Sequence, residues 1–390
     1  MNILYSSRTR GVGAESVHIS GISNALQKLG NKVYFHSPGE VQPGSDPFKN
    51  GKGKAYLLSI LCRWMPRIFF ELIELSYNIF SWFRVRRQLR RRDFGMIYER
   101  HAFFHFSTGS LARNYTVPLV VEVNELVGDE RVRRQPVLSG LARWCDKRLF
   151  DRASLIVVVS PYLKREIMSR HGIPCNKIEV QCNGVDEELA RGHFTPGSLD
   201  QRDDANDSCV VGFVGWFVEW HRLDLLVEVF ASLSNDSPVP NFKLLLVGDG
   251  PLRPQLVNQC RELGVYDKVI FTGAVEHCRI PEVLRGIDIA VIPHSNQYRS
   301  PLKLFEYMLE ECAVVAPKTE PISMVIDDGK NGILFRALDK ADMLKSCLKL
   351  ISDVNLRIAM GSQARQDVID GYTWGHNAQR IMVKLEALDV

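Results

Sequence analysis

Short apolar runs alternate with longer segments of helical periodicity along this chain. Runs of three to five residues bounded by turn residues are typical of buried parallel strands, and the segments between them are typical of the helices in βαβ units. We expect a first series of strands at residues 2–5, 33–35, 96–98, 119–123, 155–159 and 178–180, and a second series at residues 210–214, 243–247, 269–271, 289–293, 313–316 and 333–335. The pattern predicts an α/β protein with two parallel sheets.

A polar stretch separates the two series. Residues 186–208 contain Pro196, Gly197 and the run DQRDDANDS, a composition typical of a linker. We therefore predict a first domain over residues 1–190, a second domain over residues 209–373, and a C-terminal helix over residues 374–390. Ligands of open parallel sheets bind beyond the carboxyl ends of the strands, so two sheets facing each other would form one cleft.

Composition is compatible with two ordinary globular domains. The chain has 390 residues, of which 45% are hydrophobic and 24% charged. Nine cysteines without a CxxC pair indicate reduced thiols, and we expect no structural metal. The first residues lack a charged segment followed by an apolar one, so no signal peptide is predicted and a cytoplasmic location is expected.

The net charge of +4 hides a concentrated feature over residues 55–92. Residues 55–83 are rich in aliphatic and aromatic side chains, but a membrane-spanning helix is disfavoured because polar or helix-breaking residues interrupt them. These are Arg63, Pro66, Arg67, Glu71 and Glu74. Six arginines follow: Arg84, Arg86, Arg87, Arg90, Arg91 and Arg92. An aromatic, amphipathic element beside an arginine cluster is typical of peripheral attachment to an anionic membrane surface.

One other interpretation of this segment stays open, and a second one is weaker. It fits a buried helix followed by a solvated basic helix. Nucleic acid is not predicted as a partner, because no recognised nucleic-acid motif accompanies the arginines.

A candidate anion site begins at Ser300. Ser300 is a good N-cap and Pro301 suits the first helical position, so a helix start with free N–H groups is predicted here. Lys303 adds a charge in the first turn, and Glu306 lies one turn further on, where a carboxylate can accept hydrogen bonds from the hydroxyls of a ribose. The plainer alternative is an ordinary capped helix with a Lys/Glu pair.

The segment from residue 298 to residue 335 resembles the donor-site signature of the group-1 (family 4) glycosyltransferases. Further similar segments follow the order of that family: YERHAFF (98–104), VEVNEL (121–126), SLIVVVSPYLKREI (154–167), CNGVDEE (182–188), VGFVGWFVEWHRLDLLVEVF (211–230) and LLLVGDGPLR (244–253). The resemblance covers nearly the whole chain outside residues 40–95. It implies the GT-B arrangement of two Rossmann-like domains, with an acceptor domain first, a donor domain second and a terminal helix that crosses back to the first.

The resemblance also implies donor-site roles. Lys303 would bind the diphosphate together with a second basic residue, either Arg222 or His221, and the choice between them stays open. Glu306 resembles the second glutamate of the family's E-x7-E motif, whereas Tyr298 stands where the first glutamate is usual, with Asn296 nearby as a replacement contact. The remaining donor-binding candidates are Gly215, Gly248, Val275, Ser300 and Leu304.

The first domain offers less specific candidates. Gly11 and Gly13 resemble the family's glycine loop, although a plain strand-to-helix turn explains them as well. Glu15 follows the loop, and Arg100 suits an acceptor phosphate or a structural ion pair. Asn124 stands where relatives often carry a catalytic histidine; it cannot act as a base, and with Lys303 and Arg222 it completes the catalytic candidates.

These features predict a metal-independent, retaining glycosyltransferase that uses a nucleotide-diphosphate sugar and no other cofactor. The expected acceptor is a lipid-linked carbohydrate or polysaccharide precursor at the cytoplasmic face of the membrane. Rival interpretations are another GT-B enzyme, such as a sugar-nucleotide epimerase or a phosphorylase, and a non-catalytic partner subunit. The missing first glutamate and Asn124 favour the partner subunit, whereas Ser300, Lys303 and Glu306 oppose it.

Overall fold

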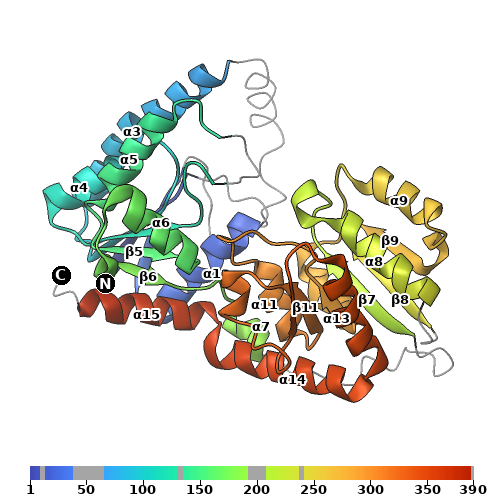
Figure 1. Ribbon diagram of the computed structural model, residues 1–390. Helices are drawn as coiled ribbons and strands as arrows, with labels where there is room; N and C mark the ends of the chain where they lie inside the picture. The colour runs from blue at the N-terminus through green and yellow to red at the C-terminus, as the bar shows by residue number, and fades with distance from the viewer. Residues whose placement is uncertain (9–13, 38–65, 130–134, 192–207, 237–240, 388–390) are drawn as a thin grey trace. The chain divides into compact units, whose positions relative to one another are not determined.

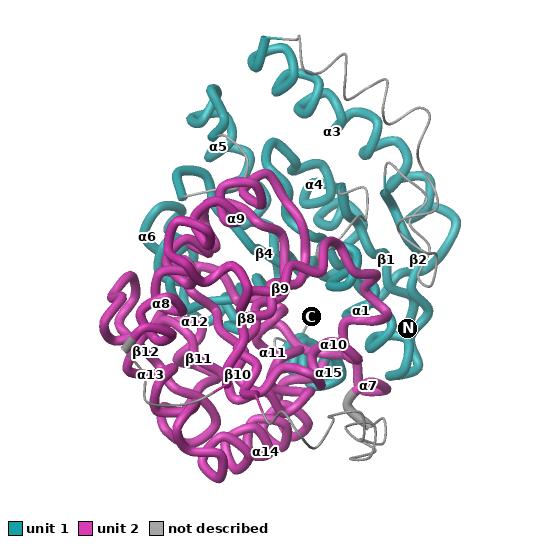
Figure 2. The backbone as a smooth tube through the Cα atoms, turned by 90° about the vertical axis from the view of Figure 1, so that its right-hand side faces the viewer, with its two compact units in different colours: residues 1–181, 374–390 teal, residues 182–373 magenta. Residues whose placement is uncertain are grey.

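The computed structural model describes residues 1–8, 14–37, 66–129, 135–191, 208–236 and 241–387 (Figure 1). The chain folds into two compact units, one made of residues 1–181 with 374–390 and the other of residues 182–373 (Figure 2). Each unit contains one parallel sheet with helices around it, as expected from the alternation of strand and helix patterns. Gly11 and Gly13 lie outside the described residues.

The first unit contains a six-stranded parallel sheet in the order β2-β1-β3-β4-β5-β6. Its strands are β1 (Asn2–Ser6), β2 (Lys32–His36), β3 (Met96–Arg100), β4 (Leu119–Val123), β5 (Leu155–Val158) and β6 (Ile178–Val180). Its helices are α1 (Ala14–Lys28), α3 (Arg67–Leu89), α4 (Ser107–Tyr115), α5 (Ser139–Phe150), α6 (Pro161–His171) and α15 (Trp374–Glu386).

The second unit contains a six-stranded parallel sheet in the order β12-β11-β10-β7-β8-β9. Its strands are β7 (Cys209–Val214), β8 (Phe242–Val247), β9 (Val269–Gly273), β10 (Ile289–Val291), β11 (Ala313–Pro317) and β12 (Ile333–Phe335). Its helices are α7 (Glu187–Arg191), α8 (Leu223–Asp236), α9 (Arg253–Glu262), α10 (Ile280–Leu284), α11 (Leu302–Leu309), α12 (Glu320–Ser323), α13 (Lys340–Ser352) and α14 (Val354–Gly371).

Both faces of the second sheet are buried, which explains its continuous apolar strands. Along β11, Ala313 and Val315 join one hydrophobic cluster while Val314 and Ala316 join another. Successive side chains of a strand point to opposite faces, so a sheet covered on both faces needs apolar residues at every position. The expected strands are therefore all present, and their ends differ from the expected ones by at most two residues.

The boundary between the units lies at Gln181 and Cys182, whereas the sequence pattern placed the end of the first domain at residue 190. Residues 182–191 pack with the second unit for a physical reason. The Val185 N–H donates to the Tyr372 carbonyl at 3.0 Å, and the Val185 side chain is buried in a cluster of that unit. Long-range pairing of this kind leaves no local signal in the sequence.

Helix α15 belongs to the first unit, where it packs against α1. Gly21 on α1 lies under the ring of Trp374, since a Cβ atom at Gly21 would come within 2.3 Å of the indole nitrogen. The His18 ring meets the same indole edge-on at 4.6 Å between centroids. A glycine is therefore required for the close approach of these two helices.

Candidate functional site

Lys303, in the first turn of α11, has a buried ammonium nitrogen with no hydrogen-bond partner. The nitrogen lies 3.9 Å from the centroid of the Phe213 ring, at the carboxyl end of β7. Burial lowers the pKa of Lys303 to about 7, and the carboxylate of Glu306 opposes this effect only in part. A buried cation without a hydrogen-bond acceptor is costly, so this position favours an anionic ligand.

Three glycines pack closely in the turns after β7 and β8, and Gly215 lies against the Lys303 ammonium. A Cβ atom at Gly215, which directly follows β7, would lie 2.6 Å from the Lys303 nitrogen. Gly248 follows β8 and has φ +130°, and a Cβ atom there would collide with the Gly215 carbonyl oxygen. Gly250 is packed equally closely against the backbone of Phe217. These contacts hold the two turns tightly together, and Gly215 brings the backbone close to the lysine.

Ser300 is not the N-cap of α11. Pro301 occupies the cap position in an extended conformation, with no side-chain hydrogen bond, and the helix begins at Leu302. The Ser300 hydroxyl instead accepts the Asn183 N–H at 3.0 Å, and the Ser300 carbonyl accepts the Asn183 side-chain amide at 2.6 Å. Ser300 therefore anchors residues 182–185 to the second unit. Its hydroxyl binds a partner that is distant in the sequence and does not cap its own helix.

His221 is close enough to Lys303 to feel its charge, whereas Arg222 is paired with a carboxylate. Burial, with Lys303, Arg299 and His294 nearby, lowers the pKa of His221 to about 2, so its imidazole is neutral. Its Nδ1 atom is buried and has no hydrogen-bond partner. The Arg222 guanidinium is 40% exposed and binds the Asp224 carboxylate at 2.9 Å. The structure thus gives Arg222 an acidic partner, and it places the His221 ring 5.3 Å from the Phe213 ring that Lys303 also contacts.

Glu306 lies one turn after Lys303 on α11 and is half-buried. Burial raises the pKa of Glu306, while His277 and Lys303 oppose the rise. Leu304 is buried in the core and its N–H donates to the Pro301 carbonyl at 3.1 Å, so this residue offers no free side-chain contact to a ligand. Val275 is half-buried against the same apolar cluster as Leu304.

The residues before α11 carry aromatic and cationic groups. Tyr298, which replaces the first glutamate of the motif, is 3% exposed. The Arg299 guanidinium lies 5.4 Å from the Tyr298 ring and 5.9 Å from the Trp220 ring. Asn296 is half-buried. The carboxylate of the family pattern is therefore replaced here by a buried phenol beside an arginine.

Tyr307 is a supporting residue that the sequence pattern did not single out. Its hydroxyl accepts the Val214 N–H at 2.8 Å and donates to the Val214 carbonyl at 3.3 Å. It therefore fixes α11 to the end of β7, next to Gly215. The only sequence signal was a tyrosine on the apolar face of a helix, which buries its hydroxyl only when a polar partner is available.

The first unit has a separate polar cluster around Glu122 on β4. The Glu122 carboxylate is buried and accepts hydrogen bonds from the Tyr98 hydroxyl at 2.9 Å, from Arg100 at 2.6 Å and from the Asn124 amide. The His18 Nε2 atom lies 3.5 Å from the same carboxylate. Burial opposes its ionisation, but His18, Arg100 and the two hydrogen bonds hold the pKa of Glu122 below its ordinary value.

This cluster decides what the first-unit candidates can do. Asn124 commits its amide nitrogen to Glu122, which leaves its carbonyl oxygen to accept a hydroxyl. Arg100 makes the structural ion pair that was one of its two expected roles, and Glu15 adds negative charge near it. Glu122 itself was not predicted, although a carboxylate inside an otherwise apolar strand was its visible signal.

Two further properties concern metals and membranes. In the part of the chain that the structure describes, no group of three or more His, Cys, Asp or Glu side chains could hold a metal ion. No helix within the described ranges has the length and apolar content needed to cross a bilayer.

Two family models match this chain. The one described as "Glycosyl transferases group 1" matches residues 208–353, and the one described as "Glycosyltransferase Family 4" matches residues 15–189. Together they cover most of both units and include Lys303, Glu306, His221 and the Glu122 cluster.

The chain is similar to a characterised transferase in sequence and to solved glycosyltransferase-type structures in fold. The chain is 23% identical over 300 residues to an alpha-D-kanosaminyltransferase of Streptomyces kanamyceticus, covering 73% of this chain and 75% of that protein. Anabaena HepE, solved in complex with UDP, is 18% identical with a TM-score of 0.69, covering 99% of this chain and 100% of the other. The sucrose-phosphate synthase of Thermosynechococcus elongatus is 15% identical with a TM-score of 0.74, covering 100% and 99%.

Both solved structures share the fold of this chain, with two parallel six-stranded sheets and flanking helices. The chain belongs to the group-1 (family 4) glycosyltransferases and has the GT-B fold.

Proposed function

We propose that this protein transfers a sugar from a nucleotide-diphosphate sugar to an acceptor hydroxyl. The observation that carries the proposal is the Lys303 ammonium, which is buried without a hydrogen-bond partner between Phe213 and Gly215. A diphosphate would supply the missing acceptors and the missing negative charge. The UDP in the Anabaena relative supports this choice of ligand class.

Three features around Lys303 complete the donor site in this proposal. Leu302 and Lys303 precede the first backbone hydrogen bond of α11, which runs from Leu304 to Pro301, and their N–H groups favour a phosphate oxygen. The neutral His221 imidazole offers a hydrogen bond without adding charge. Glu306 accepts hydrogen bonds from the ribose hydroxyls, and a charged Lys303 favours its ionised carboxylate, which accepts them most strongly.

We propose retention of the anomeric configuration. The bond between the anomeric carbon and the diphosphate oxygen breaks while the acceptor oxygen forms its bond on the same face. The acceptor proton passes to the departing diphosphate, so no protein nucleophile is needed. Lys303 stabilises the developing phosphate charge in place of a metal ion, and transfer should therefore persist in a chelator.

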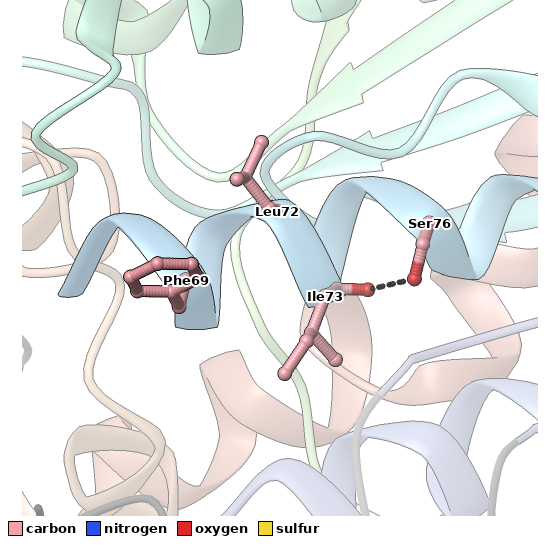
Figure 3. A pocket seen from close by; sticks show the side chains of 4 residues that line it. All are labelled: Phe69, Leu72, Ile73 and Ser76. Atoms are coloured by element: carbon pink, nitrogen blue, oxygen red, sulfur yellow. Dashed lines mark hydrogen bonds between the residues drawn. The ribbon is translucent and has the colours of Figure 1, made fainter. Parts of the chain in front are cut away.

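The proposed acceptor is lipid-linked. Helix α3 exposes a row of large apolar side chains, and an open cavity of about 410 Å³ is lined by Phe69, Leu72, Ile73 and Ser76 (Figure 3). An apolar row beside arginines suits a protein that meets its substrate at a membrane surface. Association with the cytoplasmic face of a membrane is part of this proposal.

The test is isothermal titration of UDP, GDP, ADP, dTDP and CMP in the presence of EDTA. We expect one nucleoside diphosphate to bind, and we expect Lys303→Ala to weaken that binding by roughly 10- to 100-fold, the usual effect of losing a hydrogen bond to a charged group. Lys243→Ala is the matched control, because Lys243 is an exposed lysine of the same unit. Unchanged binding in Lys303→Ala would overturn the assignment of the donor site.

Transfer is measured with the sugar nucleotide of the base that binds and with lipid-linked acceptors. Binding of a nucleoside diphosphate without transfer to any of these acceptors would favour the non-catalytic partner subunit.

A further inference from the structure

Helices α3, α4 and α5 form one continuous layer on the first unit. Helix α4 contacts both α3 and α5, and its beginning is tied to α3 by the Asn78 side chain, which accepts the Phe106 and Ser107 N–H groups at 2.9 and 3.0 Å (Figure 1). The Glu71 carboxylate on α3 accepts the Val137 and Leu138 N–H groups that precede α5. The side chains of these three helices are therefore held in fixed relation to one another.

Three arginines converge where α4 meets the end of α5. Arg113 and Arg148 are exposed, and Arg148 lies 5.2 Å from the ring of the exposed Trp144. Arg152 follows α5 and donates to the Ser110 hydroxyl on α4. Burial, followed by the nearby charges of Arg148 and Arg113, lowers the pKa of Arg152.

A second pair of arginines borders α4 on the side of α3. Arg86 and Arg90 hydrogen-bond to the Tyr115 hydroxyl at the end of α4, and these bonds and charges lower the pKa of that phenol. Arg86 also lies 4.7 Å from the Trp82 ring. We call the set Arg86, Arg90, Arg113, Arg148 and Arg152 the arginine belt.

Two carboxylates in α5 and at its C-terminal end already have partners. Asp151 binds Lys147 at 2.9 Å, and the buried Asp146 binds His101 at 2.9 Å. Among the described residues, the charge interaction of Arg152 with Asp151 is the only one that joins a member of the belt to a carboxylate. The belt therefore carries a positive charge that a bound anion would stabilise.

We propose that the arginine belt is a binding site for the phosphate headgroups of anionic phospholipids, in which Arg113, Arg148 and Arg152 extend the arginine run at residues 84–92 onto α4 and α5. This inference deepens the proposed function, because it names the surface on which a lipid-linked acceptor is met. The layer of α3, α4 and α5 lies on the bilayer as one platform.

A lipid surface fits better than a nucleic acid because the same layer exposes large apolar groups. Phe69 is 58% exposed and Phe83 62%, and Trp144 is 49% exposed beside Arg148. Apolar and aromatic side chains enter the interface of a bilayer while arginines hold its phosphates. A nucleic-acid surface would leave the aliphatic row of α3 in water.

The test is flotation of the purified full-length chain with phosphatidylcholine vesicles and with vesicles that also contain phosphatidylglycerol. We expect binding only to the anionic vesicles, and we expect it to weaken as added salt shortens the screening length. The triple variant Arg113→Gln/Arg148→Gln/Arg152→Gln should lose about 100-fold in binding, since each basic residue near an anionic surface is worth roughly fivefold. Free inorganic phosphate is titrated separately to distinguish a headgroup site from a soluble-anion site.

The matched control is Arg279→Gln/Lys330→Gln/Arg336→Gln, which removes the same charge from exposed positions of the second unit. It should bind anionic vesicles like the unaltered protein. Equal binding by the belt variant, equal loss in both triple variants, or tighter capture of a single-stranded oligonucleotide than of vesicles would each overturn the proposal. Affinity for a nucleoside diphosphate without vesicles tests the donor site separately, and the unfolding transition of the first unit shows whether the belt variant is folded.

Discussion

Lys303 is a lysine whose charge state depends on whether its ligand is present. Without an anion, burial favours the neutral amine, because the ammonium has no hydrogen-bond partner in the described structure. A bound diphosphate reverses that preference, since opposite charge stabilises the ammonium. Binding above about pH 7 is therefore coupled to the uptake of one proton by Lys303.

The affinity of the protein for a nucleotide should depend on pH through Lys303. Because the pKa of free Lys303 is about 7 and the pKa of the bound state is higher, the affinity should fall as the pH rises from about 7 to about 9, by at most tenfold per unit. Titration calorimetry in buffers of different ionisation enthalpy should detect the proton uptake. Lys303→Arg keeps its charge and should flatten the profile; an equally steep profile in that variant would assign the proton to another group.

The same lysine contributes to stability without nucleotide. Its folded-state pKa of about 7 lies below its unfolded-state value, so the unfolded chain binds more protons in the interval between them. This group alone makes stability rise with pH through that interval. Lys303→Met removes the contribution, and the difference between the two unfolding profiles isolates it.

At the scale of elements, the contact between α1 and α15 depends on one glycine. Replacing a helical glycine by alanine usually stabilises a helix by about 1 kcal/mol. At Gly21 the sign should reverse, because the new methyl group would collide with Trp374. We expect Gly21→Ala to lower the free energy of unfolding by about 1–3 kcal/mol, measured by urea denaturation.

Gly140 provides the comparison for this prediction. It lies in α5, and a Cβ atom there would have no neighbour within 4 Å. Gly140→Ala should therefore be neutral or stabilising by up to about 1 kcal/mol. Similar destabilisation by both substitutions would mean that the close approach of α1 and α15 does not decide the effect.

Elements were predictable from sequence wherever local pattern determines them. The strands followed from apolar runs because both faces of the second sheet are buried, and the start of α6 followed its signals, with the Ser160 hydroxyl accepting the Leu163 N–H and Pro161 in the first turn. Ser300 and Pro301 gave the same signal and a different result. The partner of Ser300 is Asn183, more than a hundred residues earlier, and no local pattern reports it.

The candidate site was likewise predictable only where the local sequence determines it. The position of Lys303 at a helix start was visible, but its burial and its contact with the Phe213 ring depend on a strand ninety residues earlier. The choice between His221 and Arg222 depended on Asp224, which lies two residues from Arg222 and was available as a competing partner. The members of the Glu122 cluster come from three different strands or helices. The sequence could therefore indicate single residues of the cluster but not their contacts with one another.

At the scale of the whole molecule, the two units have separate hydrophobic interiors, and the proposed donor site lies within one of them. We expect calorimetry to resolve two unfolding transitions. Saturating nucleotide should raise the transition of residues 182–373, by the equivalent of about 2.7 kcal/mol at a concentration of 100 times Kd. Gly21→Ala should lower the other transition. A nucleotide shift confined to the transition that Gly21→Ala lowers would place the donor site in the first unit.

The discontinuity of the first unit has a consequence during protein synthesis. Residues 182–373 form a contiguous unit, whereas the first unit needs α15, which is synthesised only after them. On a ribosome the second unit emerges complete before Trp374 can pack over Gly21 on α1. The nascent first unit therefore keeps an uncovered helix face until late in translation, when a chaperone that recognises apolar surface would have its longest opportunity to bind.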